Sequence, residues 1–102
     1  MTPPVAGMKG PDIPGFQWVR PLGQGGFADV FLYRQELPSR EVAIKVVRMQ
    51  GDERGTKELH READAMTLLA GHPSVVELHG VGTTADGRAY LIMEYCPVAD
   101  LL

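Results

Sequence analysis

The sequence is poor in cysteine, in long apolar runs and in excess charge of either sign. Its single cysteine, Cys96, excludes an intrachain disulfide and leaves too few thiols for a structural zinc site, so a reducing compartment is the default. No apolar stretch approaches the ~20 residues that span a bilayer, and the N-terminus lacks the charged-then-apolar order of a signal peptide. We therefore expect a soluble, cytoplasmic protein whose segment here makes no membrane contact.

Basic and acidic residues are evenly mixed along the chain, and the formal net charge is −3. Without a basic stripe, nothing indicates nucleic acid or an anionic lipid surface as a partner. His60, His72 and His79 show no metal-ligand spacing with one another or with Cys96. We therefore expect no metal site made by this segment.

The length and composition fit one small domain, because 102 residues with 44% hydrophobic content build a modest core and leave no room for a second full domain. Residues 1–15 hold four prolines and three glycines with almost no apolar periodicity. We expect them to form a flexible leader outside the fold, with the folded domain at residues 16–102. A further segment begins after Cys96 and stops at Leu102, so the sequence reads as interrupted there.

Two periodicities divide the domain. Runs rich in β-branched and aromatic residues predict strands, and apolar residues at helical spacing predict one helix. An Asp-Gly turn at 85–88 favours a hairpin between the last two strands. The expected strands are 16–20, 29–34, 41–47, 75–81 and 89–95, and the expected helix is 56–70.

A glycine cluster at residues 23–26 separates the first two expected strands. Residues 23–30 approach the pattern G-x-G-x-x-G-x-V, with Ala28 in place of the third glycine. Since a strand follows rather than a helix, a dinucleotide-binding fingerprint is excluded, and no Gly-Lys-Ser/Thr is present for a Walker loop. Such a hairpin offers backbone N–H groups without bulky side chains, which suits phosphate oxygens; a purely structural turn is the alternative.

Lys45 places a charge inside an apolar run. In an extended strand it shares one face with Ala43 and Val47, and the other face carries Val42, Ile44 and Val46. Burying an unpaired ammonium is costly, so Lys45 needs an anionic partner unless it is solvated like an ordinary strand lysine.

Glu62 supplies that partner. It lies between Leu59 and Met66, on the helix face that should pack against the sheet. The alternative is that Glu62 lies at the boundary of the buried helix face and that its carboxylate reaches water. A carboxylate on this stripe needs a cation as much as Lys45 needs an anion, so we predict that the two form an ion pair.

These three features, the glycine-rich hairpin, the run 42–45 and the helix residue Glu62, resemble in order and spacing the amino-terminal lobe of a eukaryotic-type protein kinase. The resemblance covers residues 16–102. Segments 22–27 and 69–73 are similar to those of bacterial Hanks-type serine/threonine kinases. The resemblance implies an α+β fold with a five-stranded antiparallel sheet and one αC-type helix. It also implies an ATP-binding lobe that, in a complete kinase, serves transfer of the γ-phosphate to protein hydroxyls.

The resemblance assigns roles to individual residues. Lys45 and Glu62 would be the catalytic pair, in which Lys45 holds the α- and β-phosphates of ATP. Core packing is the alternative for the apolar members of the site, and a solvated acid is the alternative for Asp100. The expected ATP-binding residues besides Lys45 are the loop glycines Gly23, Gly25 and Gly26, the adenine roof Leu22, Val30 and Ala43, the gatekeeper Met93, the hinge residues Glu94 and Cys96, and the ribose contact Asp100.

The family's catalytic loop, its Asp-Phe-Gly magnesium motif and its Ala-Pro-Glu element have no match in the chain. Bound Mg²⁺ is therefore expected only together with a carboxy-terminal lobe after Leu102, and this chain alone should not transfer phosphate. The expected partners are ATP and the protein substrate of the complete kinase. A non-catalytic pseudokinase or regulatory binding module stays open as the alternative. A small β-rich domain unrelated to ATP would leave the Lys45 and Glu62 pattern unexplained.

Overall fold

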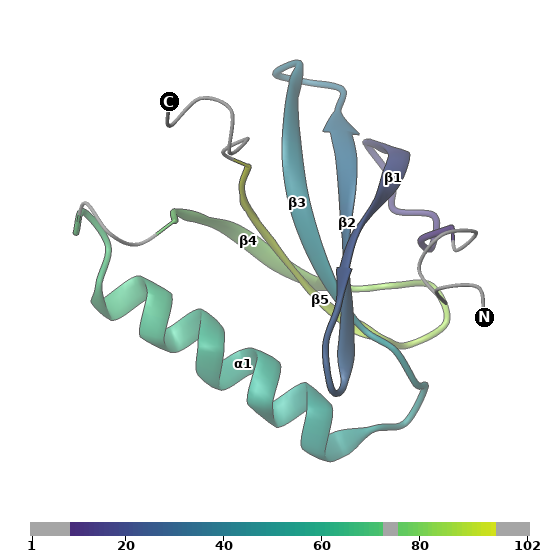
Figure 1. Cartoon of the computed structure of the whole chain (residues 1–102), viewed down its shortest axis with the longest axis vertical. Coiled ribbons are helices and arrows are strands. Elements are labelled where there is room, and N and C mark those ends of the chain that lie inside the picture. Colours follow the sequence, from purple (N-terminus) through teal and green to yellow (C-terminus); the bar gives the residue numbers. More distant parts are fainter. Residues whose placement is uncertain (1–8, 73–75, 96–102) are drawn as a thin grey trace.

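The structure is a computed structural model that describes residues 9–72 and 76–95. These residues form a five-stranded sheet and a helix (Figure 1). The strand order is β1-β2-β3-β5-β4, and every neighbouring pair is antiparallel. The predicted α+β architecture is therefore confirmed. The elements are β1 (Phe16–Gln24), β2 (Ala28–Gln35), β3 (Arg40–Val47), α1 (Glu53–Leu68), β4 (Leu78–Thr83) and β5 (Ala89–Glu94).

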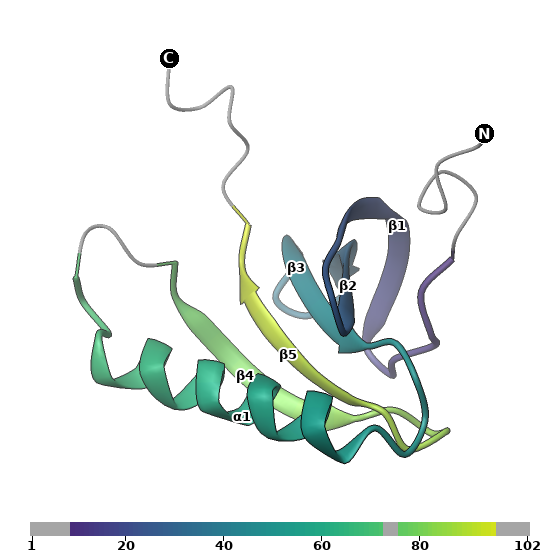
Figure 2. The same cartoon turned by 60° about the horizontal axis from the view of Figure 1, so that its bottom comes forward.

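The sheet buries apolar side chains on both faces. On the face that we call the outer face, Val42, Ile44 and Val46 of β3 pack with a cluster that includes Phe31 and Tyr33 of β2. On the opposite face, which we call the helix face, Val47 packs with Leu59 and Ala63 of α1 and with Leu91 of β5. The alternation predicted for β3 is confirmed. Figures 1 and 2 show α1 running beside β4 and β5, and α1 also contacts β3.

Helix α1 begins three residues before the predicted start at 56 and ends at Leu68 rather than at 70. Its start is fixed by Asp52, whose side chain accepts a hydrogen bond of 2.8 Å from the Gly55 N–H. The prediction missed this turn because Glu53 and Arg54 are exposed and carry no apolar period. At the other end, the N–H of Leu69 and the N–H of Ala70 bond back to carbonyls in the last turn.

The amino-terminal segment corrects one prediction. Residues 9–15, expected to lie outside the fold, pack on the outer face. Ile13 is only 3% exposed and belongs to the outer-face cluster, and the Tyr33 hydroxyl donates a 2.5 Å hydrogen bond to the Pro11 carbonyl oxygen. Composition missed this packing because one isoleucine among prolines and glycines has no periodicity to reveal it. Residues 1–8 lie outside the described part.

The bounds of β1 and β4 also differ from the predicted ones. β1 continues to Gln24, which pairs with Asp29, so part of the glycine cluster is strand rather than turn. β4 begins at Leu78 and ends at Thr83, later than the predicted 75–81, and residues 73–75 lie outside the described part. The predicted hairpin between β4 and β5 is present, with Gly87 at φ 87°. Within the described ranges, no helix combines the length and apolar character that crossing a membrane requires.

Candidate functional site

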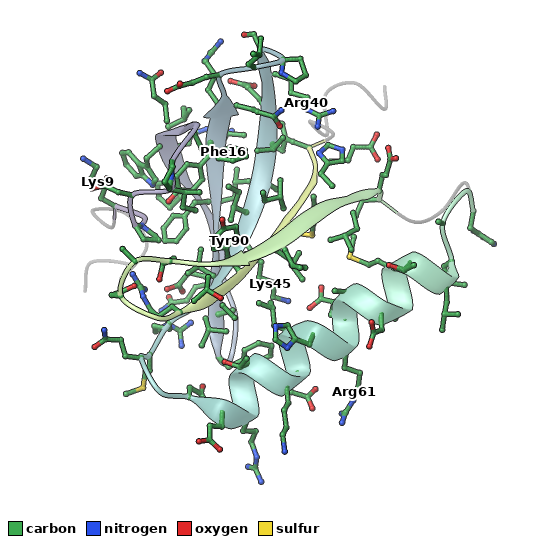
Figure 3. The ribbon with its side chains drawn as sticks, turned by 180° about the vertical axis from the view of Figure 1, so that it is seen from behind. Lys9, Phe16, Arg40, Lys45, Arg61 and Tyr90 are labelled. Carbon is green, nitrogen blue, oxygen red and sulfur yellow. The ribbon has the colours of Figure 1, made fainter. Side chains whose placement is uncertain are left out.

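Lys45 and Glu62 meet on the helix face. Lys45 in β3 lies directly opposite Val30 of β2 and Leu91 of β5. Its Nζ donates a hydrogen bond of 2.8 Å to Oε1 of Glu62 in α1. Figure 3 shows the Lys45 side chain extending from the sheet toward α1. This contact confirms the predicted ion pair. The side chains of Lys45 and Glu62 are 22% and 37% exposed, so the ammonium group of Lys45 remains accessible to solvent.

Phe27 packs over this pair. Its ring centroid lies 5.5 Å from Nζ of Lys45, within the range of a cation–π contact. The ring also contacts the helix-face cluster, and a Cβ on Gly55 would approach it to 3.2 Å. An aromatic side chain from the loop between β1 and β2 therefore joins β3 to the first turn of α1. No role was predicted for Phe27 from the sequence.

The loop that carries Phe27, residues 23–27, is named the glycine-rich loop. None of its glycines has a positive φ, so backbone conformation does not require glycine at these positions. A Cβ at Gly25 would come within 3.3 Å of the Ala28 carbonyl oxygen, whereas a Cβ at Gly23 or Gly26 would meet no atom of the described residues within 4 Å. Neither strain nor internal packing explains Gly23 and Gly26. Open space above them is what a closely approaching ligand needs.

Arg48, immediately after β3, forms several hydrogen bonds with this loop. Its guanidinium donates to the carbonyl oxygens of Gly25 at 2.6 Å, Gly26 at 3.2 Å and Ala28 at 3.3 Å. It also pairs with Asp29 at 2.9 Å, and Asp29 is only 4% exposed. Neither Arg48 nor Asp29 was predicted from the sequence to take part in the site. The available signal was an acid and a base at neighbouring ends of two apolar strands.

The turn between β4 and β5 contacts the backbone of Arg48. Arg88 donates to the Arg48 carbonyl oxygen at 3.4 Å and pairs with Asp86 at 3.0 Å. The hydroxyl of Thr84 donates to the Asp86 carboxylate. This hydrogen bond, followed by the positive charge of Arg88, lowers the pKa of Asp86. The turn is thus linked to Arg48, the residue that bonds the glycine-rich loop.

The apolar residues predicted to line an adenine pocket are partly brought together. In antiparallel pairs, directly opposite residues share a face, so Val30 opposite Lys45 and Met93 opposite Ala43 all lie on the helix face. Ala43 is 7% exposed, and Met93 is partly buried against the helix-face cluster. Leu22 lies at a register irregularity of β1, between Pro21 and Gly23, and is half-buried.

The predicted hinge residues are only partly described. Glu94 ends β5, where its N–H donates to the Glu77 carbonyl oxygen at 2.8 Å and its carboxylate accepts from the Glu77 N–H at 3.1 Å. Cys96 and Asp100 lie outside the described residues. Among residues 9–72 and 76–95, no three His, Cys, Asp or Glu side chains are grouped so that they could hold a metal ion.

Comparison with known proteins places the chain in a family. The family model for protein tyrosine and serine/threonine kinases matches residues 16–102. The serine/threonine-protein kinases PknK of Mycobacterium tuberculosis and Mycobacterium bovis are each 37% identical to the chain over 91 residues. The match covers 83% of this chain and 8% of each relative.

The matched region, the sheet with its helix, and the bonded lysine and glutamate agree with one another. The strand order and the pairing of Lys45 with Glu62 are those expected for the amino-terminal lobe of a Hanks-type kinase. The chain therefore belongs to the protein tyrosine and serine/threonine kinase family.

Proposed function

We propose that this chain is the ATP-binding lobe of a serine/threonine protein kinase and that the complete kinase transfers the γ-phosphate of ATP to hydroxyl groups of a protein. The observation that carries the proposal is the hydrogen-bonded pair of Lys45 and Glu62 on the helix face. The preference for serine and threonine is supported by the names of the mycobacterial relatives.

Several residues fit a nucleoside triphosphate. Gly23 and Gly26 leave open space, so phosphate oxygens can approach backbone N–H groups. Lys45 offers an accessible ammonium that Glu62 orients, which suits the α- and β-phosphates. Val30, Ala43 and Met93 share the helix face with Lys45 and supply apolar surface for a base, with Leu22 beside them in β1. Glu94, Cys96 and Asp100 remain the proposed hinge and ribose contacts.

Mg²⁺ does not fit the described residues, which hold no group of metal ligands. We assign its ligands, and the base that accepts the substrate proton, to a carboxy-terminal lobe. The contribution of this chain to catalysis is positioning: it holds the triphosphate through Lys45 and the glycine-rich loop, and it shields one side of the nucleotide from water.

Nucleotide titration of the isotope-labelled chain, followed by NMR, tests the proposal. We expect ATP to bind weakly, because affinity depends on contacts from both sides of a pocket, and we expect no measurable hydrolysis. Lys45→Met should weaken ATP binding. The control Lys57→Met removes an exposed lysine of α1 and should leave binding unchanged.

Three outcomes would contradict the proposal. If the folded chain binds no ATP, the regulatory-module alternative replaces it. If Lys45→Met and Lys57→Met weaken binding equally, the interaction is general charge attraction. If resonance changes map to the outer face, the nucleotide site is misplaced.

A further inference from the structure

The proposed function does not use the set of hydrogen bonds that Arg48 forms with the glycine-rich loop. One guanidinium contacts four groups of the chain: the carbonyl oxygens of Gly25, Gly26 and Ala28 and the Asp29 carboxylate. Asp29 is nearly buried, so the carboxylate requires this cation. The loop carbonyl groups are thus bonded to the arginine of an ion pair.

Arg48 contacts the loop from the outer face of the sheet. Asp29 lies directly opposite Val46, which belongs to the outer-face cluster, and Arg48 follows Val46 by two residues. Directly opposite residues of an antiparallel pair share a face, so Asp29 lies on the outer face. Arg48, just beyond the end of β3, reaches the Asp29 carboxylate there, opposite the side that carries Lys45. The loop therefore lies between Arg48, which binds its carbonyl groups, and Lys45, which lies on the proposed phosphate side.

A trans peptide bond points its C=O and its N–H in opposite directions. Because Arg48 draws the carbonyl groups of Gly25 and Gly26 toward the outer face, the N–H groups of Gly26 and Phe27 are directed toward the Lys45 side. Neither N–H makes a hydrogen bond to any residue that the structure describes, whereas the Gly25 N–H is bonded to the Ala28 carbonyl oxygen at 2.8 Å.

We propose that Arg48, held by Asp29, is a positioning residue that orients the glycine-rich loop so that the N–H groups of Gly26 and Phe27 face the phosphates of the nucleotide. This inference rests on the proposed ATP-binding function. Arg48 touches no nucleotide in this arrangement; it acts through the peptide planes of the loop.

The arrangement requires an arginine rather than any cation. The planar guanidinium presents five donors in a fixed fork, and here it bonds the carboxylate and the loop carbonyl groups at once. A lysine keeps the charge but has one nitrogen, which cannot reach all of these acceptors together. Arg48→Lys therefore separates geometry from electrostatic attraction of phosphate.

The test compares ATP with adenosine, which lacks phosphates, by NMR titration of the labelled chain. For Arg48→Lys we expect ATP to bind about tenfold more weakly while adenosine affinity stays within about twofold, as loss of oriented hydrogen bonds to a charged ligand implies. Arg34→Lys is the matched control, because Arg34 forms an exposed 3.5 Å pair with Glu41 at the other end of β2. It should change neither affinity.

A measurement on the wild type needs no variant and remains decisive if Arg48→Lys does not fold. ATP should shift the amide proton resonances of Gly26 and Phe27 more than that of Gly25, and adenosine should not. The inference is overturned if these shifts are absent, or if Arg48→Lys weakens ATP and adenosine equally or neither. If the wild type binds neither ligand, the proposed function itself fails.

Discussion

The energetic coupling between Lys45 and Glu62 is the prediction that most directly probes the site. Two unit charges 4 Å apart attract by about 4 kcal/mol at an effective dielectric constant of about 20. Here the side chains are 22% and 37% exposed, so water screens the pair and desolvation offsets part of the attraction. We expect a net coupling of about 1 kcal/mol, at the upper end of the range for exposed pairs.

A double-mutant cycle measures this coupling. The variants are Lys45→Met, Glu62→Gln and their combination, and the quantity is the free energy of unfolding from urea titration. The cycle matters more than either single change, because Met at position 45 adds apolar contact with Phe27 and the helix-face cluster. Lys45→Met alone therefore gives no reliable value for the pair.

Glu58 and Arg61 of α1 supply the matched control. Their carboxylate and guanidinium are 2.7 Å apart, as close as the site pair, but their side chains are 45% and 75% exposed. Exposed helix pairs of this spacing contribute about 0.2–0.5 kcal/mol. A coupling for Lys45 and Glu62 no larger than that of the control would refute the reasoning that partial burial strengthens the site pair.

Three further predictions concern residues outside the site. Ile13→Ala should lower the free energy of unfolding by about 2–4 kcal/mol in urea titration, because Ile13 is 3% exposed, while Val19→Ala, at a position 37% exposed, should cost far less. Burial raises the pKa of the Tyr33 phenol. Below the ordinary phenol pKa of about 10 its contribution to stability is complete, and above that pH the unfolded chain ionises first and stability is lost. The urea midpoint of Tyr33→Phe should therefore fall less than that of the wild type as pH rises above 10, and equal falls would contradict the assignment. Asp52→Ala should cost about 1 kcal/mol by removing the cap of α1, whereas Asp64→Ala, on the exposed side of the same helix, should leave the urea midpoint nearly unchanged.

The elements whose signals are local were predictable. In β3 the alternation around Lys45 assigned residues correctly to the two faces, because side chains of a strand point alternately to opposite sides. In α1 the spacing of Leu59 and Ala63 identified the buried stripe, and from it the position of Glu62. The helix start was misplaced because its first turn is polar and depends on a cap.

The sequence alone therefore determined the class of fold, the family resemblance and the pair of Lys45 and Glu62, since each follows from a short period or motif. Only the tertiary structure decided which distant groups meet. Arg48 reaches the glycine-rich loop because antiparallel pairing brings the end of β3 to the start of β2, and this register cannot be read from either segment alone. Ile13 enters the core for the same reason: its burial depends on an outer face assembled from strands that follow it in the chain.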